Sequence, residues 1–520
     1  MLARCSSFLN SQRLAFSTSA SVENLSCKLV TPNGLSYSQP TGLFINNAFI
    51  KSSTSFNELL TAECPATASQ IAQVESASSS DIDLAVNVAR AAYYGEWNHT
   101  NGTERGQLLL KLSSLISESR HLLASVEAWD SGRPFTIAQT EDVQDIVNVS
   151  RYYAGWSDKA LVGRTQEQDL NRFSYTVRES LGVCGLIVPW NYPLMIAMWK
   201  LAPAVAAGNT VILKPAPETS LSTLLLGDLI RQAGFPPGVI NILPGDKSVG
   251  RELTLHKGIN KISFTGSTST GKQVLMSAAQ NLVPVSIELG GKSAAIVFDD
   301  ADLANAVNWS IFGCFGNSGQ MCSATGRIFV HERIYDEFIG KFIKAIHETI
   351  KMGLPFESTT THGPLISASQ QKKVLMFINS AMTDRAELLF KGNSILFSSG
   401  YFVEPTVFGN VSDDMVVAKE EIFGPVALIS KFATDDEVIQ RVNSTMYGLA
   451  SAVFTSNMSK AISMSKKLKS GTIYLNCSND TDFRIPFGGY KASGNSTSRD
   501  LGLEGIESYT QVKSVLMKVS

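Results

Sequence analysis

Residues 183–214 read VCGLIVPWNYPLMIAMWKLAPAVAAGNTVILK, in which two short apolar runs flank a longer apolar segment. The runs at 183–188 and 210–213 are rich in β-branched residues and predict strands. The segment between them, 194–207, is long enough for a helix. Strand, helix and strand in this order predict two parallel strands joined by a crossover helix.

The same alternation continues to residue 298. Further strands are predicted at 239–243, 261–264 and 295–298, and further helices at 220–233, 249–256 and 270–279. We therefore expect an α/β protein with a doubly wound parallel sheet, of the kind that binds a nucleotide at its carboxyl edge.

Outside this stretch the pattern is less regular. Upstream, residues 80–92 and 103–128 each predict one helix, and downstream 301–358 and 435–469 look like mixed strand and helix. A chain of 520 residues exceeds what one hydrophobic core usually serves. These observations predict two or three domains, the second of them also α/β.

Composition excludes several classes of partner. Lys and Arg total 44 against 46 Asp and Glu, so the net charge is -2, and no long cationic run favours binding of nucleic acid or of a membrane surface. The most apolar segment contains Lys200 and Pro203, which argues against a membrane span. Seven scattered cysteines without C-x-x-C spacing, and six histidines without ligand spacing, predict neither a disulfide framework nor a metal site.

The first 25 residues differ from the rest. They contain Arg4 and Arg13, many Ser and Thr, and no acidic residue before Glu23. This composition resembles a mitochondrial transit peptide, although a frayed cytosolic N-terminus is the alternative. We expect import into the mitochondrial matrix and removal of this segment.

Two glycine-containing segments carry possible chemistry. Residues 264–273, FTGSTSTGKQ, follow a strand and open a helix, as a phosphate site does, but Gln273 stands where a Walker A motif needs Ser or Thr. Residues 266–271 are therefore either a tight turn or an anion site. Glu288 lies in an apolar stretch before two glycines, where burial would suit a general base, but a structural glutamate fits equally.

A cysteine and an asparagine are further candidates. Cys322 lies in the small, polar segment NSGQMCSA rather than in an apolar run, and backbone amides there could lower its pKa and make it a nucleophile. The alternative is a small core residue. Asn191 follows the first parallel strand, where it is either an oxyanion donor or the cap of a turn.

Seven motifs in one order resemble the aldehyde dehydrogenase superfamily. They are PWN at 189–191, KPA at 214–216, FTGST at 264–268, ELGGK at 288–292, GQMC at 319–322, EEIFGP at 420–425 and PFGG at 486–489. The resemblance covers roughly residue 42 to the C-terminus. Residues 32–35 and 39–47 look like fungal mitochondrial acetaldehyde dehydrogenases in particular, which agrees with a transit peptide.

The resemblance implies a catalytic role for four residues. Cys322 would attack the aldehyde, and Asn191 with the Cys322 backbone N–H would hold the oxyanion of the thiohemiacetal. After hydride transfer, Glu288 would activate the water that hydrolyses the thioester, and Lys200 would help to order that water. The cofactor would be NAD or NADP, bound by Trp190, Lys214, Gly266, Ser267, Gly271, Glu421 and Phe423.

The resemblance also implies a domain plan. Residues 40–158 and 181–290 would form the NAD(P)-binding domain, 291–490 the catalytic domain, and 159–180 with 505–520 a bridging element that joins subunits into homodimers or homotetramers. Substrate would reach the nucleophile through a tunnel lined by Tyr192, Ile196, Trp199, Met321, Ser323, Thr481 and Phe487.

Two departures from the family pattern bear on function. Pro217 stands where the family often has a glutamate that binds the adenosine ribose, with Glu218 next, so the preference between NAD and NADP stays open. The loop from Asn495 to Asp500 is two residues longer, with Asp500 where glutamate is usual.

We expect oxidation of small aliphatic aldehydes such as acetaldehyde. The alternatives are an amino-aldehyde or semialdehyde dehydrogenase, which a charged tunnel lining would favour, and a catalytically idle protein on the same fold. No charged side chain occurs among the predicted tunnel positions.

Overall fold

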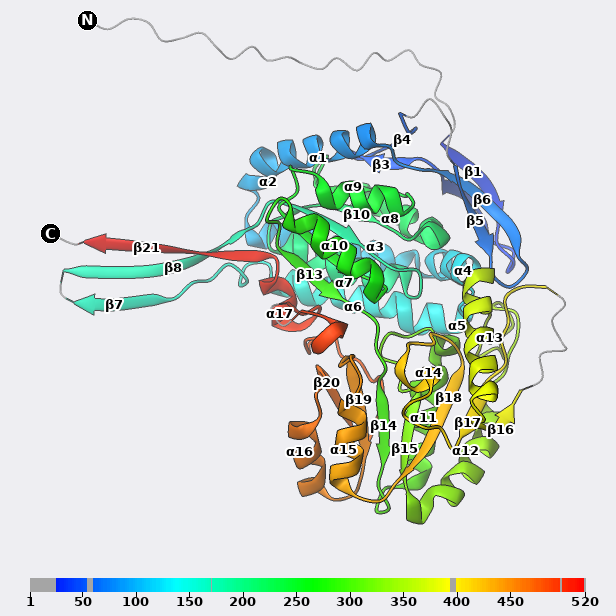
Figure 1. Cartoon of the computed structure of the whole chain (residues 1–520). Coiled ribbons are helices and arrows are strands. Elements are labelled where there is room, and N and C mark those ends of the chain that lie inside the picture. Colours follow the sequence, from blue (N-terminus) through cyan, green and yellow to red (C-terminus); the bar gives the residue numbers. More distant parts are fainter. Residues whose placement is uncertain (1–24, 54–58, 170, 393–398, 496–497, 519–520) are drawn as a thin grey trace, which may run out of the picture.

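Three β-sheets organise the chain in a computed structural model that describes residues 25–53, 59–169, 171–392, 399–495 and 498–518. In Figure 1 the first large sheet and its helices form the upper part of the molecule, the second lies below, and a narrow three-stranded arm extends to the left. The expected transit peptide lies outside the described residues. Within the described ranges, no helix is both long enough and apolar enough to span a membrane.

The first sheet has seven strands in the order β13-β12-β9-β10-β11-β3-β4. Their bounds are Val285–Glu288, Lys261–Thr265, Val183–Ile187, Thr210–Lys214, Ile240–Ile242, Leu43–Ile45 and Ala48–Ile50. Strands β9 to β13 run parallel, while β3 and β4 add an antiparallel edge. From β9 the chain adds β10 and then β11 on one side of the sheet, and it then adds β12 and β13 on the other side of β9. The strand order therefore reverses between β9 and β12, where such sheets bind ligands.

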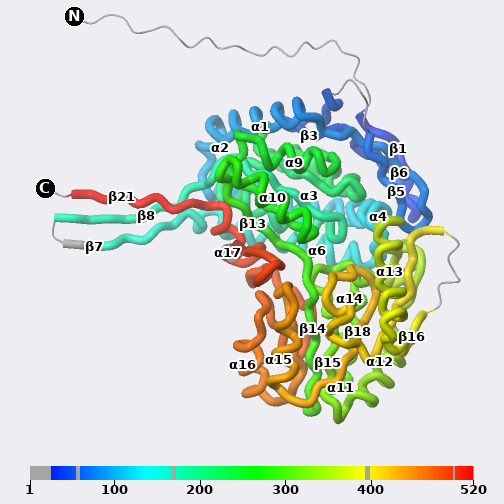
Figure 2. Tube along the Cα trace, in the orientation of Figure 1, coloured from blue at the N-terminus to red at the C-terminus, as the bar shows by residue number. Residues whose placement is uncertain are grey.

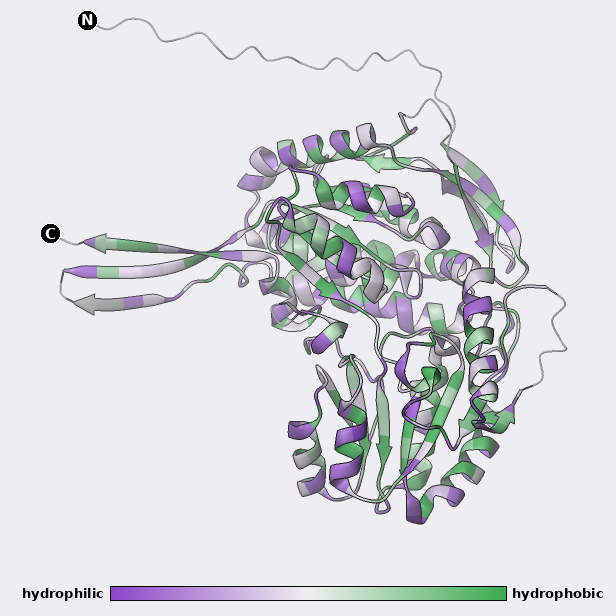
Figure 3. Ribbon diagram, in the orientation of Figure 1, coloured by the Kyte–Doolittle hydropathy of each residue, from purple (hydrophilic) through white to green (hydrophobic). Residues whose placement is uncertain are grey.

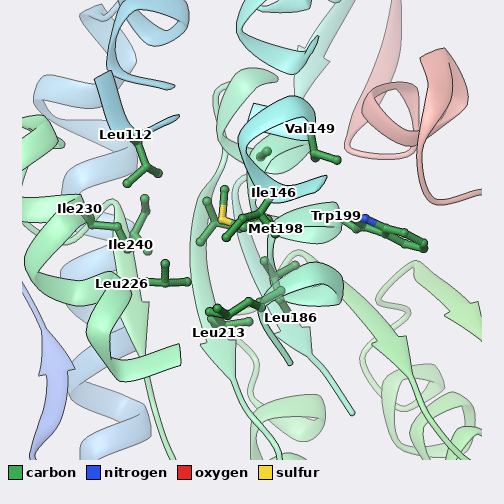
Figure 4. Close-up of a cluster of buried hydrophobic side chains, with 14 of the residues drawn as sticks. Leu112, Ile146, Val149, Leu186, Met198, Trp199, Leu213, Leu226, Ile230 and Ile240 are labelled. Atoms are coloured by element: carbon green, nitrogen blue, oxygen red, sulfur yellow. The ribbon is translucent and has the colours of Figure 1, made fainter. Parts of the chain in front are cut away.

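Helices cover both faces of this sheet. One face carries α3 (Gly102–Glu118), α6 (Val143–Trp156), α7 (Pro193–Ala206) and α8 (Ser220–Ala233), and the other carries α1 (Ser79–Tyr94), α9 (Lys247–Leu255) and α10 (Thr268–Ala279). Pro193 occupies the first turn of α7, where its missing N–H costs nothing. Figure 4 shows Leu186 and Leu213 of the strands beside Met198 of α7. Burial on both faces explains the uninterrupted apolar strands.

The second sheet also has seven strands, in the order β16-β17-β18-β15-β14-β19-β20. Their bounds are Glu387–Lys391, Thr406–Gly409, Val426–Phe432, Arg327–His331, Ala294–Val297, Ala450–Phe454 and Thr472–Leu475. All pairs are parallel except β16 with β17. The flanking helices are α11 (Leu303–Phe315), α12 (Tyr335–Thr349), α13 (Ala368–Thr383), α15 (Asp435–Asn443) and α16 (Met458–Lys467). The green central strands in Figure 3 show how apolar this layer is.

The arm is an antiparallel sheet of β7 (Thr165–Asp169), β8 (Arg172–Ser180) and β21 (Thr510–Lys518). Its middle strand β8 pairs with β21 from Thr510 opposite Ser180 to Lys518 opposite Arg172. Figure 2 shows the C-terminal strand leaving the body beside β8.

The remaining elements are short. Two small hairpins pair β1 (Ser26–Val30) with β2 (Ser36–Pro40) and β5 (Leu59–Cys64) with β6 (Ser69–Glu75). The other helices are α2 (Glu96–His99), α4 (Arg120–Ser131), α5 (Phe135–Ile137), the π-turn η1 (Ala138–Asp142), α14 (Val416–Lys419) and α17 (Gly502–Glu507), and the 3₁₀ turns η2 (Pro217–Thr219), η3 (Gly316–Gly319), η4 (Glu332–Ile334) and η5 (Lys491–Ser493).

The structure corrects three secondary-structure predictions. Residues 103–128 are not one helix, because Ser119 (φ -87°, ψ 8°) separates α3 from α4, although both helices bury a face in the same core and so continue one apolar pattern. The strand predicted at 295–298 is β14, which belongs to the second sheet. Strand β13 was missed because Ser286 and Glu288 interrupt its apolar character.

Candidate active site

The candidate catalytic residues come from different parts of the fold, and two of them line one cavity. Asn191 follows β9, Glu288 ends β13, and Cys322 follows α11 and η3 beside the second sheet. Glu288 and Cys322 line a cavity of ≈ 810 Å³, and so does Asp500 from near the C-terminus. The two large sheets therefore both contribute chemistry to a single site.

The loop before Cys322 holds the thiol in place through unusual backbone geometry. Asn317 (φ 50°) and Ser318 (φ 54°) are left-handed, and a Cβ on Gly319 would fall 2.1 Å from the Gly424 carbonyl oxygen. Side chains fix these conformations, since Ser318 Oγ donates to Gly363 O at 2.8 Å. Strained residues that the surrounding structure enforces are typical of functional sites.

The environment of the thiol differs from our expectation. Burial raises the pKa of Cys322 well above its usual value, and the charges of Glu288 and Glu421 raise it further, while the Ser323 N–H acts in the opposite direction. A backbone amide does act as predicted, but burial and the two carboxyl groups outweigh it, so the expected net lowering of the pKa was wrong. The thiol holds its proton and shares a hydrogen bond with the Glu288 carboxyl group.

Glu288 has the properties of a general base. Burial raises its pKa to about 8, the Asp500 charge adds to this effect, and Lys200 opposes it. Its Oε1 has no hydrogen-bond partner within the described part of the chain. A buried carboxyl group with a free oxygen and a pKa near neutrality is suited to accept a proton during turnover.

Asn191 is locked against the nucleophile loop. Its Nδ2 donates to Gln320 O at 3.0 Å, and its backbone carbonyl accepts a hydrogen bond of 2.9 Å from Asn317 Nδ2. An amide nitrogen carries two hydrogens, so one remains for an oxyanion formed beside Cys322. This position fits the donor interpretation, and the contacts also fix the amide's orientation.

Lys200 lies behind the base rather than among the cavity-lining residues. Its ammonium group is fully buried and lies 2.9 Å from Asp500 Oδ2 and 3.1 Å from Ser263 Oγ. The sequence did not suggest this ion pair. Through Asp500, Lys200 belongs to the charge network that surrounds Glu288.

Three predicted cofactor residues, Trp190, Lys214 and Gly266, lie at or shortly beyond the carboxyl ends of β9, β10 and β12, beside the crevice expected where the strand order reverses. The rings of Trp190 and Phe423 meet edge to face at 5.3 Å, and Glu421 Oε1 accepts the Gly291 N–H at 2.9 Å. Ser267 caps α10 by accepting the Thr270 N–H, directly after Gly266. A dinucleotide's phosphates would suit this helix N-terminus.

Gly271 lies one turn further into α10. There a Cβ would fall 2.4 Å from Leu289 Cδ2. Close packing against Leu289 is therefore sufficient to explain why this position is glycine, and contact with a cofactor is not needed to explain it.

Acidic groups surround the buried Lys214 at the end of β10. Lys214 Nζ donates to Gly245 O at 2.5 Å. Burial lowers the pKa of Lys214 to about 8, and the negative charges of Glu218 and Asp246 oppose this lowering. Glu218 Oε2 is buried without a partner among the described residues. A free carboxylate oxygen beside an ammonium group fits the hydroxyls of an adenosine ribose, so the crevice can accept the cofactor.

The seven predicted tunnel residues all line the cavity that contains Cys322. The structure adds acidic residues that sequence reasoning missed, namely Glu141, Asp142, Asp145, Asp480 and Asp482. Asp145 Oδ2 accepts the Trp199 Nε1–H at 2.7 Å, and burial raises the Asp145 pKa to about 7. The available signal was the acidic spacing at 141, 142 and 145 before an apolar helix. The tunnel therefore carries charge, contrary to our expectation.

The fold defines the class of dinucleotide-dependent oxidoreductases, and the site places a cysteine beside a candidate base. Residues 49–515 match the model of the aldehyde dehydrogenase family, and the chain belongs to that family. The resemblance found in the sequence is thereby confirmed, as are the α/β fold class and the use of a nicotinamide cofactor.

Known relatives cover nearly the whole chain. Retinal dehydrogenase 2 of Gallus gallus is 46% identical over 92% of both chains, and an aldehyde dehydrogenase of Alternaria alternata is 44% identical over 95% of this chain and 98% of its own. The NAD+ complex of an aldehyde dehydrogenase from Bacillus cereus has a TM-score of 0.89 and 41% identity, and covers 92% of this chain and 97% of its own.

Proposed function

We propose that this aldehyde dehydrogenase oxidises small aliphatic aldehydes such as acetaldehyde to carboxylic acids through a thioester on Cys322. The proposal is carried by the hydrogen bond between the Cys322 thiol and the Glu288 carboxyl group beside one cavity, with the Asn191 amide bonded to the loop that precedes the thiol. An idle protein on the same fold would have no need of a strained loop that presents a thiol to a base.

The residues divide the chemistry as follows. Glu288 takes the thiol proton while the sulfur bonds to the carbonyl carbon, and the Asn191 amide holds the resulting oxyanion. A nicotinamide held in the crevice would supply the acceptor for the hydride that leaves this carbon as the C=O bond re-forms to give the thioester. After Glu288 has released the thiol proton to solvent, its carboxylate removes a proton from water, which attacks the thioester. The C–S bond then breaks, the sulfur regains a proton, and the acid leaves.

Substitution of the nucleophile tests this proposal. Cys322→Ala should abolish formation of NADH from acetaldehyde, a loss of at least about 10³-fold, because no covalent adduct can form. The control for correct folding is the binding of NAD, which is measured by the quenching of protein fluorescence. Turnover that survives the substitution would contradict the thiol mechanism.

The acidic tunnel lining supports amino-aldehydes as a second candidate substrate class. Glu141, Asp145 and Asp480 line the cavity, and no ion pair to a cation is found for them within the described residues. Such a lining attracts an ammonium group and repels the carboxylate of a semialdehyde. Trp199, which donates to Asp145, adds an aromatic surface suited to cations.

A substrate panel separates the candidates. Acetaldehyde, 4-aminobutyraldehyde and succinate semialdehyde would be compared by kcat/KM in the wild type and in Asp145→Asn. If ammonium recognition operates, Asp145→Asn should raise KM for the amino-aldehyde by about tenfold and leave acetaldehyde within about threefold. An equal effect on both substrates would remove the amino-aldehyde candidate.

The projecting arm supports self-association as a homodimer or homotetramer. Among the described strands, β21 and β7 each pair with β8 alone, and Val512, Leu516 and Met517 on β21 expose 57%, 73% and 44% of their surface. Exposed apolar side chains on an open strand edge are suited to a second copy. Light scattering after gel filtration tests this, and Leu516→Lys with Val512→Lys should shift the protein toward a monomer.

Residence in the mitochondrial matrix remains a proposal, supported by the basic and acid-poor composition of the first 25 residues. N-terminal sequencing of the protein from isolated mitochondria tests it. A mature chain that begins near residue 25 supports import and cleavage, whereas an intact Met1 on cytosolic protein contradicts it.

A further inference from the structure

A second cavity of ≈ 500 Å³ adjoins the substrate cavity. The two share five lining residues, which are Glu141, Tyr192, Asn308, Phe312 and Met321. Met321 directly precedes the nucleophile Cys322 in the chain. We call this second space the side chamber. Cys322 itself lines only the substrate cavity, so a tail would have to pass Met321 to reach the side chamber.

Gly316 keeps the side chamber open. Its backbone angles (φ -50°, ψ 139°) are available to any residue, so the turn itself does not require glycine. Gly316 lines the chamber, and a Cβ at this position would lie 3.1 Å from Met321 Cε and 3.2 Å from Met321 Sδ. A larger side chain would therefore compete with Met321 for the chamber.

The lining of the side chamber suits a hydrocarbon. Pro134, Ile137 and Ile311 line it together with Phe312 and Met321. The Arg133 guanidinium at its wall is neutralised by Asp142, with hydrogen bonds of 2.5 and 2.8 Å.

The polar groups on the other wall carry no charge. Thr361 Oγ1 donates to Thr349 O at 3.1 Å. Burial lowers the pKa of His362 to about 4, so its ring is uncharged at neutral pH, and its Nε2 has no hydrogen-bond partner among the described residues. An apolar tail in the chamber would therefore meet an unpaired carboxyl group only at Glu141, on the boundary shared with the substrate cavity.

The substrate cavity offers a contrasting route. Its lining includes Asp145, which accepts the Trp199 N–H, Asp482, which pairs with Arg484, and Asp480, and an alkyl chain beside them would displace water from these carboxylates. The path past Met321 is therefore the less polar of the two for an alkyl tail. Methionine is unbranched and flexible, which suits a residue that must move aside for the tail.

We propose that the side chamber binds the alkyl tail of medium-chain aldehydes, with Gly316 as the residue that determines chain-length specificity. This inference rests on the proposed function, because the aldehyde group must still reach Cys322. It extends the substrate class from two or three carbons to tails of about eight carbons.

The test compares octanal with propanal. The ratio of kcat/KM for octanal to that for propanal would be measured with NAD in the wild type, in Gly316→Phe and in Gly316→Ala. The phenyl ring should fill the chamber and lower the ratio at least tenfold, since each lost methylene contact contributes several-fold. Gly316→Ala carries the same Cβ but no ring, so its ratio should stay within about threefold.

A second blocked variant approaches the chamber from the opposite wall. Ile137→Trp should lower the ratio in the same way, and it leaves the loop before Cys322 untouched. Because the ratio cancels any shared loss of activity, an unchanged ratio in both blocked variants overturns the proposal. Failure of the wild type to oxidise propanal would instead overturn the proposed function, so the two failures are distinguishable.

Discussion

The Lys200 ammonium group and the Asp500 carboxylate lie 2.9 Å apart although the two residues are 300 positions apart in the chain. Lys200 is fully buried and Asp500 exposes only 7% of its side chain. Asp500 raises the pKa of Glu288 and Lys200 lowers it. The pair thus couples the C-terminal segment to the catalytic base.

Breaking this ion pair should destabilise the protein and change the pKa of Glu288. Asp500→Asn leaves the buried Lys200 charge without a counter-ion, and we expect a loss of about 3–5 kcal/mol in the free energy of unfolding. The loss of a negative charge beside Glu288 should also lower the pKa of Glu288. Urea denaturation measures the first effect and the pH profile of turnover the second, with Asp500→Glu as the control that retains the charge. Unchanged stability would show that the pair is not maintained in solution.

Hydrolysis of the thioester should depend on the ionisation of Glu288. Its pKa is raised to about 8, and the base must be a carboxylate, so the hydrolysis rate should rise about tenfold per pH unit below 8 and level off above it. Glu288→Gln should slow formation of NADH in the first turnover, because the thiol loses its proton acceptor, and should slow the hydrolysis that follows still further, so that a burst remains. Stopped-flow absorbance checks both. Steady turnover without a burst in this variant would assign hydrolysis to another group.

The Asn191 amide should stabilise the transition state more than the bound substrate. Asn191→Ala removes the oxyanion donor, and we expect kcat to fall by about 10²- to 10³-fold with a smaller change in KM. The same amide also donates to Gln320 O, so a matched measurement of unfolding is needed. A fall in stability with unchanged kcat would mean that Asn191 serves only to fix the loop.

Cofactor choice should depend on the carboxylates beside Lys214. Glu218 and Asp246 both act on this lysine, and a 2′-phosphate placed there would meet two like charges. We therefore expect NAD to be preferred, and Glu218→Ser to raise kcat/KM for NADP relative to NAD by about tenfold. Parallel assays of NADH and NADPH formation decide this. Equal use of both cofactors by the wild type would show that neither carboxylate faces the ribose.

Local sequence pattern was sufficient for much of the architecture. The alternation in residues 183–279 predicted β9, α7, β10, α8, β12 and α10 close to their bounds, because apolar runs and helical periodicity are properties of neighbouring residues. The same pattern could not tell that the strand near residue 295 joins a different sheet. Sheet membership depends on pairing with β15 and β19, which come later in the chain.

The candidate site divides in a similar way. The residue types and their order identified Cys322, Glu288 and Asn191, since the resemblance to aldehyde dehydrogenases lies in short motifs. The raised pKa of the thiol was not predictable, because it results from burial and from Glu288 and Glu421, which other segments contribute. The acidic tunnel lining was missed for a related reason, since helical periodicity indicates a face but not which cavity that face meets.

The sequence by itself thus determined the family, the fold class and the identity of the chemical groups, because these depend on local pattern and on motifs. Only the tertiary structure decided how those groups are charged, which partner Lys200 has, and that a side chamber opens at Gly316. Those properties depend on distances between residues far apart in the chain, and burial changes electrostatic energies in ways that no local pattern contains.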